Sequence, residues 1–262
     1  MHSTAEMPPR NRSKRGHGKQ PFLITILSVL PYLAAAAALV FAGYHTMSPQ
    51  SQLYGRTFLR ESPPSRRLAL TFDDGPSDPA TLRLLEVLER HQVRASFFMI
   101  GEHVSRLPEV ARAVAKAGHE VANHTCTHPI LTLHTQAATG SEIGRCEQIL
   151  DQVVGPHSRL FRPPYGARRP AVLREVHARG LSPVMWSVAG KDWRTQSAAT
   201  IQANIISAVR GGDVILLHDG TPAGAGDQRL GTVAATNQLI PVLKDKGYRF
   251  VTVGEMLRHE CH

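Results

Sequence analysis

Short apolar runs alternate with amphipathic stretches along the chain from residue 68 to residue 253. The apolar runs are LALTF (68–72), ASFFMI (95–100), HEVAN (119–123), PVMWSV (183–188), DVILLHD (213–219) and RFVTV (249–253). Helical periodicity fills the intervals at 78–91, 104–117, 137–153, 168–179, 198–209 and 232–246. Strands alternating with helices predict a parallel sheet, either doubly wound or closed into a barrel. In such folds the functional residues gather at the carboxyl ends of the strands.

An uncharged stretch of 23 residues, from Phe22 to Tyr44, precedes these elements. It is long enough to cross a bilayer, which takes about 20 helical residues. The basic leader before it, residues 1–21, predicts that the amino terminus stays in the cytoplasm and the remainder is exported. Signal-peptide apolar cores usually run to about 7–15 residues. We therefore favour a retained anchor in the inner membrane, through residues 22–44, over secretion after signal cleavage.

The net charge of +9 is concentrated before the alternating elements. Residues 1–20 carry five basic side chains against one acidic one, and residues 45–67 carry four against one. Because little basic excess remains for the rest of the chain, we expect no nucleic-acid partner. Residues 45–66, rich in Ser, Gln, Pro and Arg, are predicted to form a linker, and residues 67–262 a single domain.

Carboxylate and imidazole side chains follow two of the predicted strands. Asp73 and Asp74 come directly after LALTF, where paired carboxylates are unfavourable unless a positive charge offsets them. His124 and His128 follow HEVAN, and histidines four apart lie on one face of a helical turn, which turns Cys126 away from them. With Asp74 they form a two-histidine, one-carboxylate set suited to zinc or another divalent transition metal. A solvated turn with two exposed histidines is the alternative at this point.

Three further segments place polar residues beside predicted strands. The segment RPPYG (162–166) forms a rigid turn that can aim a backbone N–H, although an ordinary loop would also contain it. Asp192 and Trp193 follow PVMWSV, and His218 ends the run DVILL. Each segment alone is weak evidence for a functional site, but all of them lie at strand ends, which favours one shared site.

In this order and spacing, TFDDGP (71–76), HTCTH (124–128), RPPYG, DW (192–193) and LLHD (216–219) resemble the five motifs of NodB-type polysaccharide deacetylases, the fourth family of carbohydrate esterases. The resemblance covers about residues 67–255. It implies an α/β fold, a distorted (β/α) barrel, preceded here by one transmembrane helix. It also implies a metal-dependent hydrolase that removes N-acetyl groups from N-acetylglucosamine units of peptidoglycan, chitin oligomers or an exopolysaccharide.

The resemblance implies a role for each residue of the first three motifs. Asp73 matches the family's general base, and Arg162 matches the arginine that pairs with that base. One divalent ion, Zn²⁺ or another transition metal, is expected to be bound by Asp74, His124 and His128.

The resemblance also implies how the leaving group is treated. The backbone N–H of Tyr165 matches the donor to the oxyanion, and His218 matches the acid that protonates the leaving amine. Asp192 matches the carboxylate that orients His218, and a neighbouring carboxylate raises the pKa of a histidine. The expected substrate pocket includes three apolar residues, Trp193, Leu217 and Pro163.

Two other functions use the same segments. The first is an esterase that removes O-acetyl groups from a xylan-type polymer, because the acetyl carbonyl is attacked in the same way. The second is a non-catalytic glycan-binding protein of the cell envelope. The predicted Asp73–Arg162 and Asp192–His218 pairs argue against the second, since binding alone requires no acid and no base.

Overall fold

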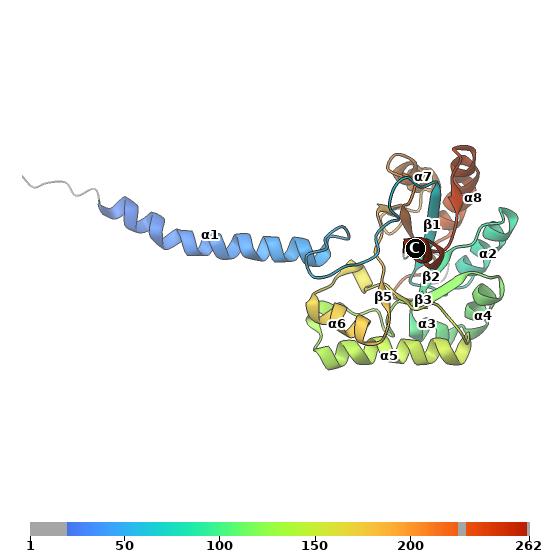
Figure 1. The fold of residues 1–262 in the computed structure, drawn as a ribbon, viewed down its shortest axis with the longest axis horizontal. Helices are drawn as coiled ribbons and strands as arrows, with labels where there is room; N and C mark the ends of the chain where they lie inside the picture. The colour runs from blue at the N-terminus through green and yellow to red at the C-terminus, as the bar shows by residue number, and fades with distance from the viewer. Residues whose placement is uncertain (1–19, 225–228, 261–262) are drawn as a thin grey trace, which may run out of the picture. The chain divides into compact units, whose positions relative to one another are not determined.

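The computed structural model describes residues 20–224 and 229–260 (Figure 1). Most of the predicted basic leader (1–21), together with Cys261, lies outside the described residues. The chain divides into two units, Met1–Gly43 and Tyr44–His262.

Helix α1 (Gln20–Met47) contains most of the predicted membrane segment. Its part Val29–Met47 has a mean hydropathy of 1.4, and none of its most apolar 18 consecutive residues is buried inside the structure. By length and composition this helix could cross a membrane, and a signal sequence near the amino terminus has the same properties. The choice between anchor and cleaved signal therefore stays a prediction.

In the described part of the second unit, the strands are all parallel and form an eight-stranded sheet. The order is β5-β4-β3-β2-β1-β7-β6, and β8 pairs with β1 beside this path. The strands are β1 (Arg67–Asp73), β2 (Ser96–Met99), β3 (Glu120–Asn123), β4 (Leu160–Phe161), β5 (Ser182–Pro183), β6 (Val188–Ala189), β7 (Val214–His218) and β8 (Arg249–Phe250). This order confirms the parallel α/β architecture that the alternating pattern predicts.

The sheet is strongly curved. Strands β5 and β6 stand at opposite ends of the order, yet only residues 184–187 separate them in sequence. A chain advances at most about 3.6 Å per residue, so the two edges must approach each other. Phe58 bonds to the β5 side, with its N–H donating to the carbonyl oxygen of Pro183 at 2.8 Å. The Glu61 N–H donates to the carbonyl oxygen of Gly212, near the β6 and β7 side, at 2.9 Å. The result is a parallel half-barrel.

Two apolar runs differ from the strands predicted for them. PVMWSV is not one strand, because β5 and β6 lie at different edges and the residues between them connect the two. RFVTV forms a strand only at Arg249–Phe250, and helix α9 (Val253–Glu260) begins at its last residue. There the Glu255 carboxylate accepts from the Thr252 N–H at 2.8 Å, while the Glu255 N–H donates to the Thr252 hydroxyl at 3.3 Å. This reciprocal capping box starts a helix inside an apolar run.

Helices cover one face of the sheet. They are α2 (Ala80–Arg90), α3 (Gly101–Arg106), α4 (Pro108–Lys116), α5 (Gln136–Val153), α6 (Pro170–Ala178), α7 (Ala198–Ile206) and α8 (Leu230–Asp245), with short 3-10 turns η1 (Leu131–Leu133) and η2 (Pro164–Gly166). The helix predicted at 104–117 is two helices, α3 and α4, separated at Leu107. Proline disfavours helical backbone in the residue before it, and Pro108 therefore starts a new helix.

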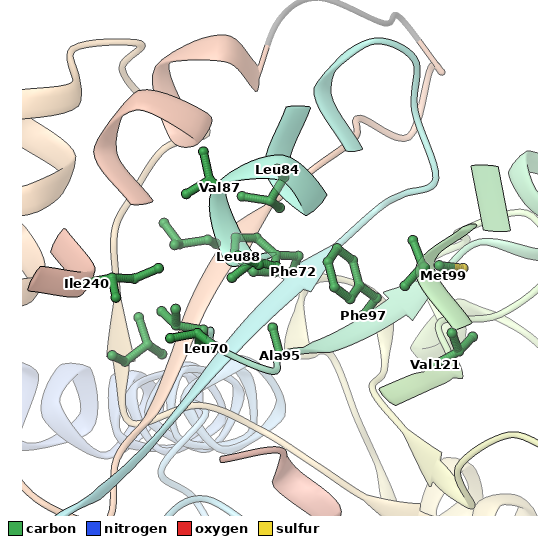
Figure 2. Close-up of a cluster of buried hydrophobic side chains, with 14 of the residues drawn as sticks. Leu70, Phe72, Leu84, Val87, Leu88, Ala95, Phe97, Met99, Val121 and Ile240 are labelled. Carbon is green, nitrogen blue, oxygen red and sulfur yellow. The ribbon is translucent and has the colours of Figure 1, made fainter. Parts of the chain in front are cut away.

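Side chains along β1 alternate between two buried faces. Leu70 and Phe72 point toward the helices and pack with Leu88 in the largest apolar cluster (Figure 2). Ala69 belongs to a second cluster on the opposite face. Because strand side chains alternate with a period of two, Asp73 shares the face of Ala69. The central strand thus carries its terminal carboxylate on the face away from the main core.

Part of the segment predicted as a linker (45–66) is hydrogen-bonded within the second unit. The Arg168 N–H donates to the carbonyl oxygen of Thr46 at 3.1 Å. The buried Arg168 guanidinium donates to the carbonyl oxygens of Ser48, Pro49 and Ser51, and to that of Gly166. The residues that directly follow α1 are thereby joined to the η2 turn of the domain.

Candidate active site

The predicted site residues lie at the carboxyl ends of neighbouring strands, as expected for a parallel sheet. Asp73 ends β1 and His218 ends β7, and the two are paired in register across the ladder. His124 directly follows β3, and Arg162 directly follows β4. The curved sheet brings these strand ends together around one cavity of about 320 Å³.

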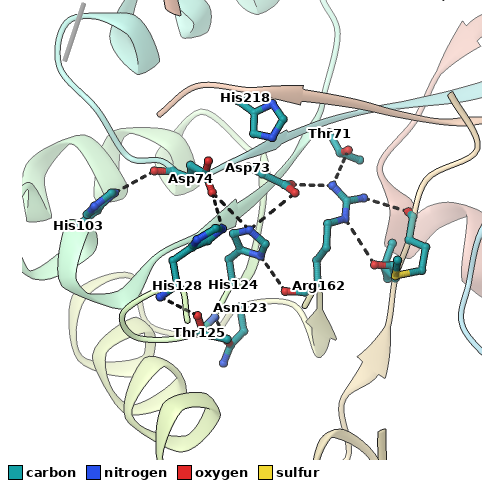
Figure 3. Close-up of polar contacts among 12 residues, drawn as sticks. Thr71, Asp73, Asp74, His103, Asn123, His124, Thr125, His128, Arg162 and His218 are labelled. Carbon is teal, nitrogen blue, oxygen red and sulfur yellow. Dashed lines mark hydrogen bonds and ion pairs between the residues drawn. The ribbon is translucent and has the colours of Figure 1, made fainter. Parts of the chain in front are cut away.

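Three predicted metal ligands converge in this cavity (Figure 3). The Oδ1 atom of Asp74 lies 3.1 Å from Nε2 of His128 and 3.4 Å from Nε2 of His124. One ligand atom from each residue lies within 4.8 Å of the other two, and all three side chains are buried. Nδ1 of His124 lies 2.7 Å from the carbonyl oxygen of Arg162, so that nitrogen must carry the proton and donate. The Nε2 lone pair of a neutral His124 is then directed at Asp74.

This arrangement fits a divalent cation. Within the described part of the chain, the buried Oδ1 of Asp74 has no hydrogen-bond donor. A buried carboxylate oxygen that faces two imidazole nitrogens is stabilised by positive charge, either on the rings or on a bound cation. Burial alone raises the pKa of Asp74, but contacts with His124 and His128 outweigh it and hold that pKa well below its usual range. Asp74 is therefore an anionic ligand at neutral pH.

The two histidines are brought together by a loop, and the helical turn expected from their spacing is wrong. Thr125 has a φ of 69° and His128 a φ of 60°, in the left-handed region that costs a non-glycine residue about 1–3 kcal/mol. Side-chain hydrogen bonds hold this backbone: the His128 N–H donates to the Thr125 hydroxyl at 3.0 Å, and the Thr125 N–H donates to Oδ1 of Asn123 at 2.8 Å. Cys126 packs in the main apolar cluster, away from the ligands.

Asp73 forms a buried ion pair with Arg162. Nη1 of Arg162 donates to Oδ1 of Asp73 at 2.6 Å and to the Thr71 hydroxyl at 2.8 Å. The guanidinium is fully buried and lies over the ring of Phe98, with 4.0 Å between its Cζ and the ring centroid. Burial lowers the pKa of Arg162, and the charge of Asp73 opposes this shift. The other carboxylate oxygen, Oδ2, lies 3.8 Å from Nε2 of His124, on the metal side.

His218 and Asp192 form the second predicted pair. Oδ1 of Asp192 accepts from Nδ1 of His218 at 2.8 Å, and Oδ2 accepts from the His218 backbone N–H at 2.8 Å. Burial alone would lower the pKa of His218, but the charge and hydrogen bond of Asp192 dominate and raise it to about 9. The ring of Trp193 meets that of His218 edge-on, with 5.4 Å between the centroids. His218 is therefore an imidazolium at neutral pH, with Nε2 as its second N–H donor.

The apolar wall of the cavity differs from the predicted one. Leu216 lines it, whereas Leu217 is completely buried in the main cluster against the helices. Strand alternation explains the difference, because Leu216 shares a face with His218. Pro163 is buried and outside the lining, while Trp193 belongs to it as predicted.

Other lining residues had no assignment from the sequence. Strand alternation could have identified Leu216, and Gly166 belongs to the RPPYG segment, whereas no local pattern points to Trp186, Pro222 or Arg229. Tyr165 also lines the cavity, has a φ of 59°, and leaves 51% of its surface exposed. A left-handed φ at a non-glycine residue beside a cavity is typical of functional sites.

Comparison with known proteins agrees with this geometry. The family described as "Polysaccharide deacetylase" matches residues 60–184. The chain is 38% identical over 191 residues to a peptidoglycan-N-acetylglucosamine deacetylase of Bacillus cereus, covering 73% of this chain and 68% of that protein. It is 39% identical over 198 residues to a chitooligosaccharide deacetylase of Bradyrhizobium, covering 70% and 87%. A crystal structure of a peptidoglycan N-acetylglucosamine deacetylase superposes with a TM-score of 0.72 at 35% identity, covering 76% of this chain and 92% of that one.

Proposed function

We propose that this chain, which belongs to the polysaccharide deacetylase family and is a hydrolase of carbon–nitrogen bonds, removes N-acetyl groups from N-acetylglucosamine units of an envelope polysaccharide. The observation that carries the proposal is one cavity in which the buried Asp74–His124–His128 triad adjoins both an Asp–Arg pair and an Asp–His pair. A binding protein has no need of these two additional pairs.

The triad is proposed to bind one divalent ion, with Zn²⁺ the first choice because two imidazoles and one carboxylate are a common zinc ligand set. When bound, such an ion supplies Lewis acidity, which polarises a carbonyl group and lowers the pKa of a water molecule. Asp74 contributes a negative charge, and the Arg162 carbonyl fixes the tautomer of His124 that offers Nε2 as a ligand.

Asp73 is the proposed general base. It stands beside the triad, and one of its oxygens, Oδ2, is left free of Arg162, which holds Oδ1 at 2.6 Å. Oδ2 accepts the proton of the attacking water while the guanidinium keeps the carboxylate oriented. The backbone N–H of Tyr165 is the proposed donor to the oxyanion, where one such donor is worth about 3 kcal/mol.

His218 is the proposed general acid, because an amine leaves readily only after it is protonated. Its Nδ1 is engaged by Asp192, which leaves Nε2 to donate into the cavity. The raised pKa of His218, about 9, keeps that proton available at neutral pH. Trp193 and Leu216 are the proposed contacts of the acetyl methyl group.

The substrate class follows from the relatives, one of which acts on peptidoglycan and another on chitooligosaccharides by their names. Both substrates present N-acetylglucosamine. We further propose that α1 retains the chain in the inner membrane, with the second unit outside the cytoplasm, where an envelope polysaccharide is accessible.

Acetate release tests the proposal. The full-length protein, in detergent and supplied with Zn²⁺, is incubated with N-acetylglucosamine oligomers, peptidoglycan and acetylated xylan, beside the Asp73→Asn variant. We expect zinc-dependent release from an N-acetylglucosamine substrate, and release about 10²- to 10⁴-fold slower by the variant. Release from xylan alone would replace the amidase by an O-acetyl esterase. No release from any substrate by folded, zinc-loaded protein would reject the hydrolase.

A further inference from the structure

The Asp192 carboxylate is held from outside the Asp192–His218 pair by a residue of α8. Among the described residues, two of its three hydrogen bonds come from His218, one from Nδ1 and one from the backbone N–H. The third comes from the hydroxyl of Thr232, which donates to Oδ2 at 2.8 Å. Bonds within the pair hold the two residues together, whereas the Thr232 bond fixes the carboxylate to a helix that neither residue belongs to.

The start of α8 makes a second connection to the same place. Arg229 is buried, and its Nη1 donates to the backbone carbonyl oxygen of Asp192 at 3.0 Å, while its Nε donates to that of Gly220 at 2.7 Å. Arg229, which directly precedes α8, therefore joins the loop after β6 to the loop after β7. These are the loops beside the two members of the pair.

Because both partners are buried, loss of the Thr232 hydrogen bond would not be compensated by solvent. Asp192 is completely buried and Thr232 is 1% exposed, so water does not replace a lost hydroxyl. A buried carboxylate that loses one of its donors rotates toward those that remain or seeks another. Because Nδ1 of His218 follows the carboxylate, rotation of Asp192 would turn the imidazole and move its Nε2.

We infer that Thr232 is a positioning residue for the acid step: its hydroxyl fixes the Asp192 carboxylate, which in turn aims Nε2 of His218 into the cavity. Arg229 supports the same loop through the backbone of Asp192. The inference rests on the proposed function, because it deepens the acid role of His218. Thr232 itself lies outside the residues that line the cavity.

The full-length Thr232→Val variant tests the inference, because valine keeps the shape of threonine and removes its hydroxyl. On an N-acetylglucosamine oligomer with Zn²⁺, we expect kcat to fall roughly ten- to a hundredfold, with KM within about twofold of wild type. Thr232→Ser, which restores the hydroxyl, should recover most of kcat.

Thr236→Val is the matched control. Thr236 is buried one turn further along α8, and its hydroxyl donates to the carbonyl oxygen of Thr232 at 2.9 Å. The variant removes a buried hydroxyl from the same helix without touching Asp192, and its kcat should stay within about twofold of wild type. An equal loss in Thr236→Val would show a general effect of α8 and overturn the inference.

A substrate whose leaving group needs no proton distinguishes a misplaced acid from other damage to the active site. p-Nitrophenyl acetate releases a phenolate that departs without a proton, so Thr232→Val should hydrolyse it within about twofold of wild type. An equal loss on this ester and on the amide would overturn the inference.

A measurement independent of turnover distinguishes failure of this inference from failure of the proposed function. The proton on Nδ1 of His218 gives an NMR resonance that reports its hydrogen bond to Asp192. We expect that resonance to shift or broaden in Thr232→Val and to stay unchanged in Thr236→Val. If wild type releases no acetate, the proposed function fails, and this resonance still decides the inference. An unchanged resonance in Thr232→Val would reject it.

Discussion

The two halves of the cavity satisfy their buried polar groups in different ways. On the β1 and β3 side, Oδ1 of Asp74 lacks a donor in the described part of the chain, and left-handed backbone at His128 presents its ligand nitrogen to that oxygen. On the β6 and β7 side, the Asp192 carboxylate accepts hydrogen bonds of 2.8 Å from described residues, two from His218 and one from Thr232. The first half is suited to a cation that balances its charges, whereas in the second half the Asp192 carboxylate has its donors among the described residues. Substitutions of the ligands in the first half should therefore affect metal binding, whereas substitutions in the second half should affect turnover and its pH dependence.

The largest effects are expected in the ligand half. His124→Ala should lose both the metal and turnover, because it removes one of three ligands. Asp73→Asn should lower turnover about 10²- to 10⁴-fold and keep the metal, since Asp73 is the proposed base and lies outside the ligand triad. Acetate release and metal content after dialysis measure the two properties separately.

His177→Ala is the control for the ligand half, because His177 is exposed on α6, away from the cavity lining, and both properties should be retained. Wild-type turnover in Asp73→Asn would exclude Asp73 as the base. Full metal content in His124→Ala would exclude that residue from the ligand set.

A smaller effect on turnover is expected in the acid half. His218→Ala should keep its metal and lower turnover about 10²-fold. The pKa of His218 is raised to about 9 by Asp192, and only the protonated ring can donate. Wild-type turnover should therefore be sustained below that pH and fall as pH rises through about 9, a limb that His218→Ala should lack. Asp192→Asn should move the limb to lower pH. An unchanged pH profile in His218→Ala would remove this residue from the acid role.

The stability of the fold should show the smallest change, and its response to a chelator should also distinguish the two halves of the cavity. A metal held at a hundred times its dissociation constant stabilises the folded state by about 2.7 kcal/mol. For a domain of this size, removal by a chelator should then lower Tm by about 5–10 °C. His218→Ala should show the same drop on chelation, because its ligand half is intact, whereas His124→Ala should show none. A chelator-insensitive wild type would mean that the triad binds no metal of structural consequence.

Local pattern predicted the residues of the site and their place at strand ends. Asp73, His124 and His218 lie where parallel strands end, because alternating strands and helices leave few other arrangements. Spacing alone misplaced the histidines: four residues apart suggests a helical turn, but the backbone of Thr125 and His128 is left-handed. The turn depends on side-chain bonds from Asn123 and Thr125, which periodicity does not reveal.

The apolar wall of the cavity gives a second example in which a sequence motif did not identify the correct residue. Leu216 and Leu217 are equally apolar, and the motif LLHD does not say which of them faces the substrate. The phase of β7 decides, because Leu216 shares the face of His218 while Leu217 packs against the helices. This choice could have been made from the sequence, once His218 was placed in the cavity.

The sequence by itself determined the parallel α/β class and the order of the strand-end motifs, because both depend on periods and spacings that a linear pattern contains. The roles of ligands, base and acid are predictions that the resemblance to the family implies. Only the tertiary structure decided that PVMWSV divides between two edges of the sheet and that Thr232 reaches Asp192 across 40 residues of sequence. The curvature of the half-barrel brings such distant segments together, and that curvature arises from the packing of the whole sheet and its helices rather than from any local stretch.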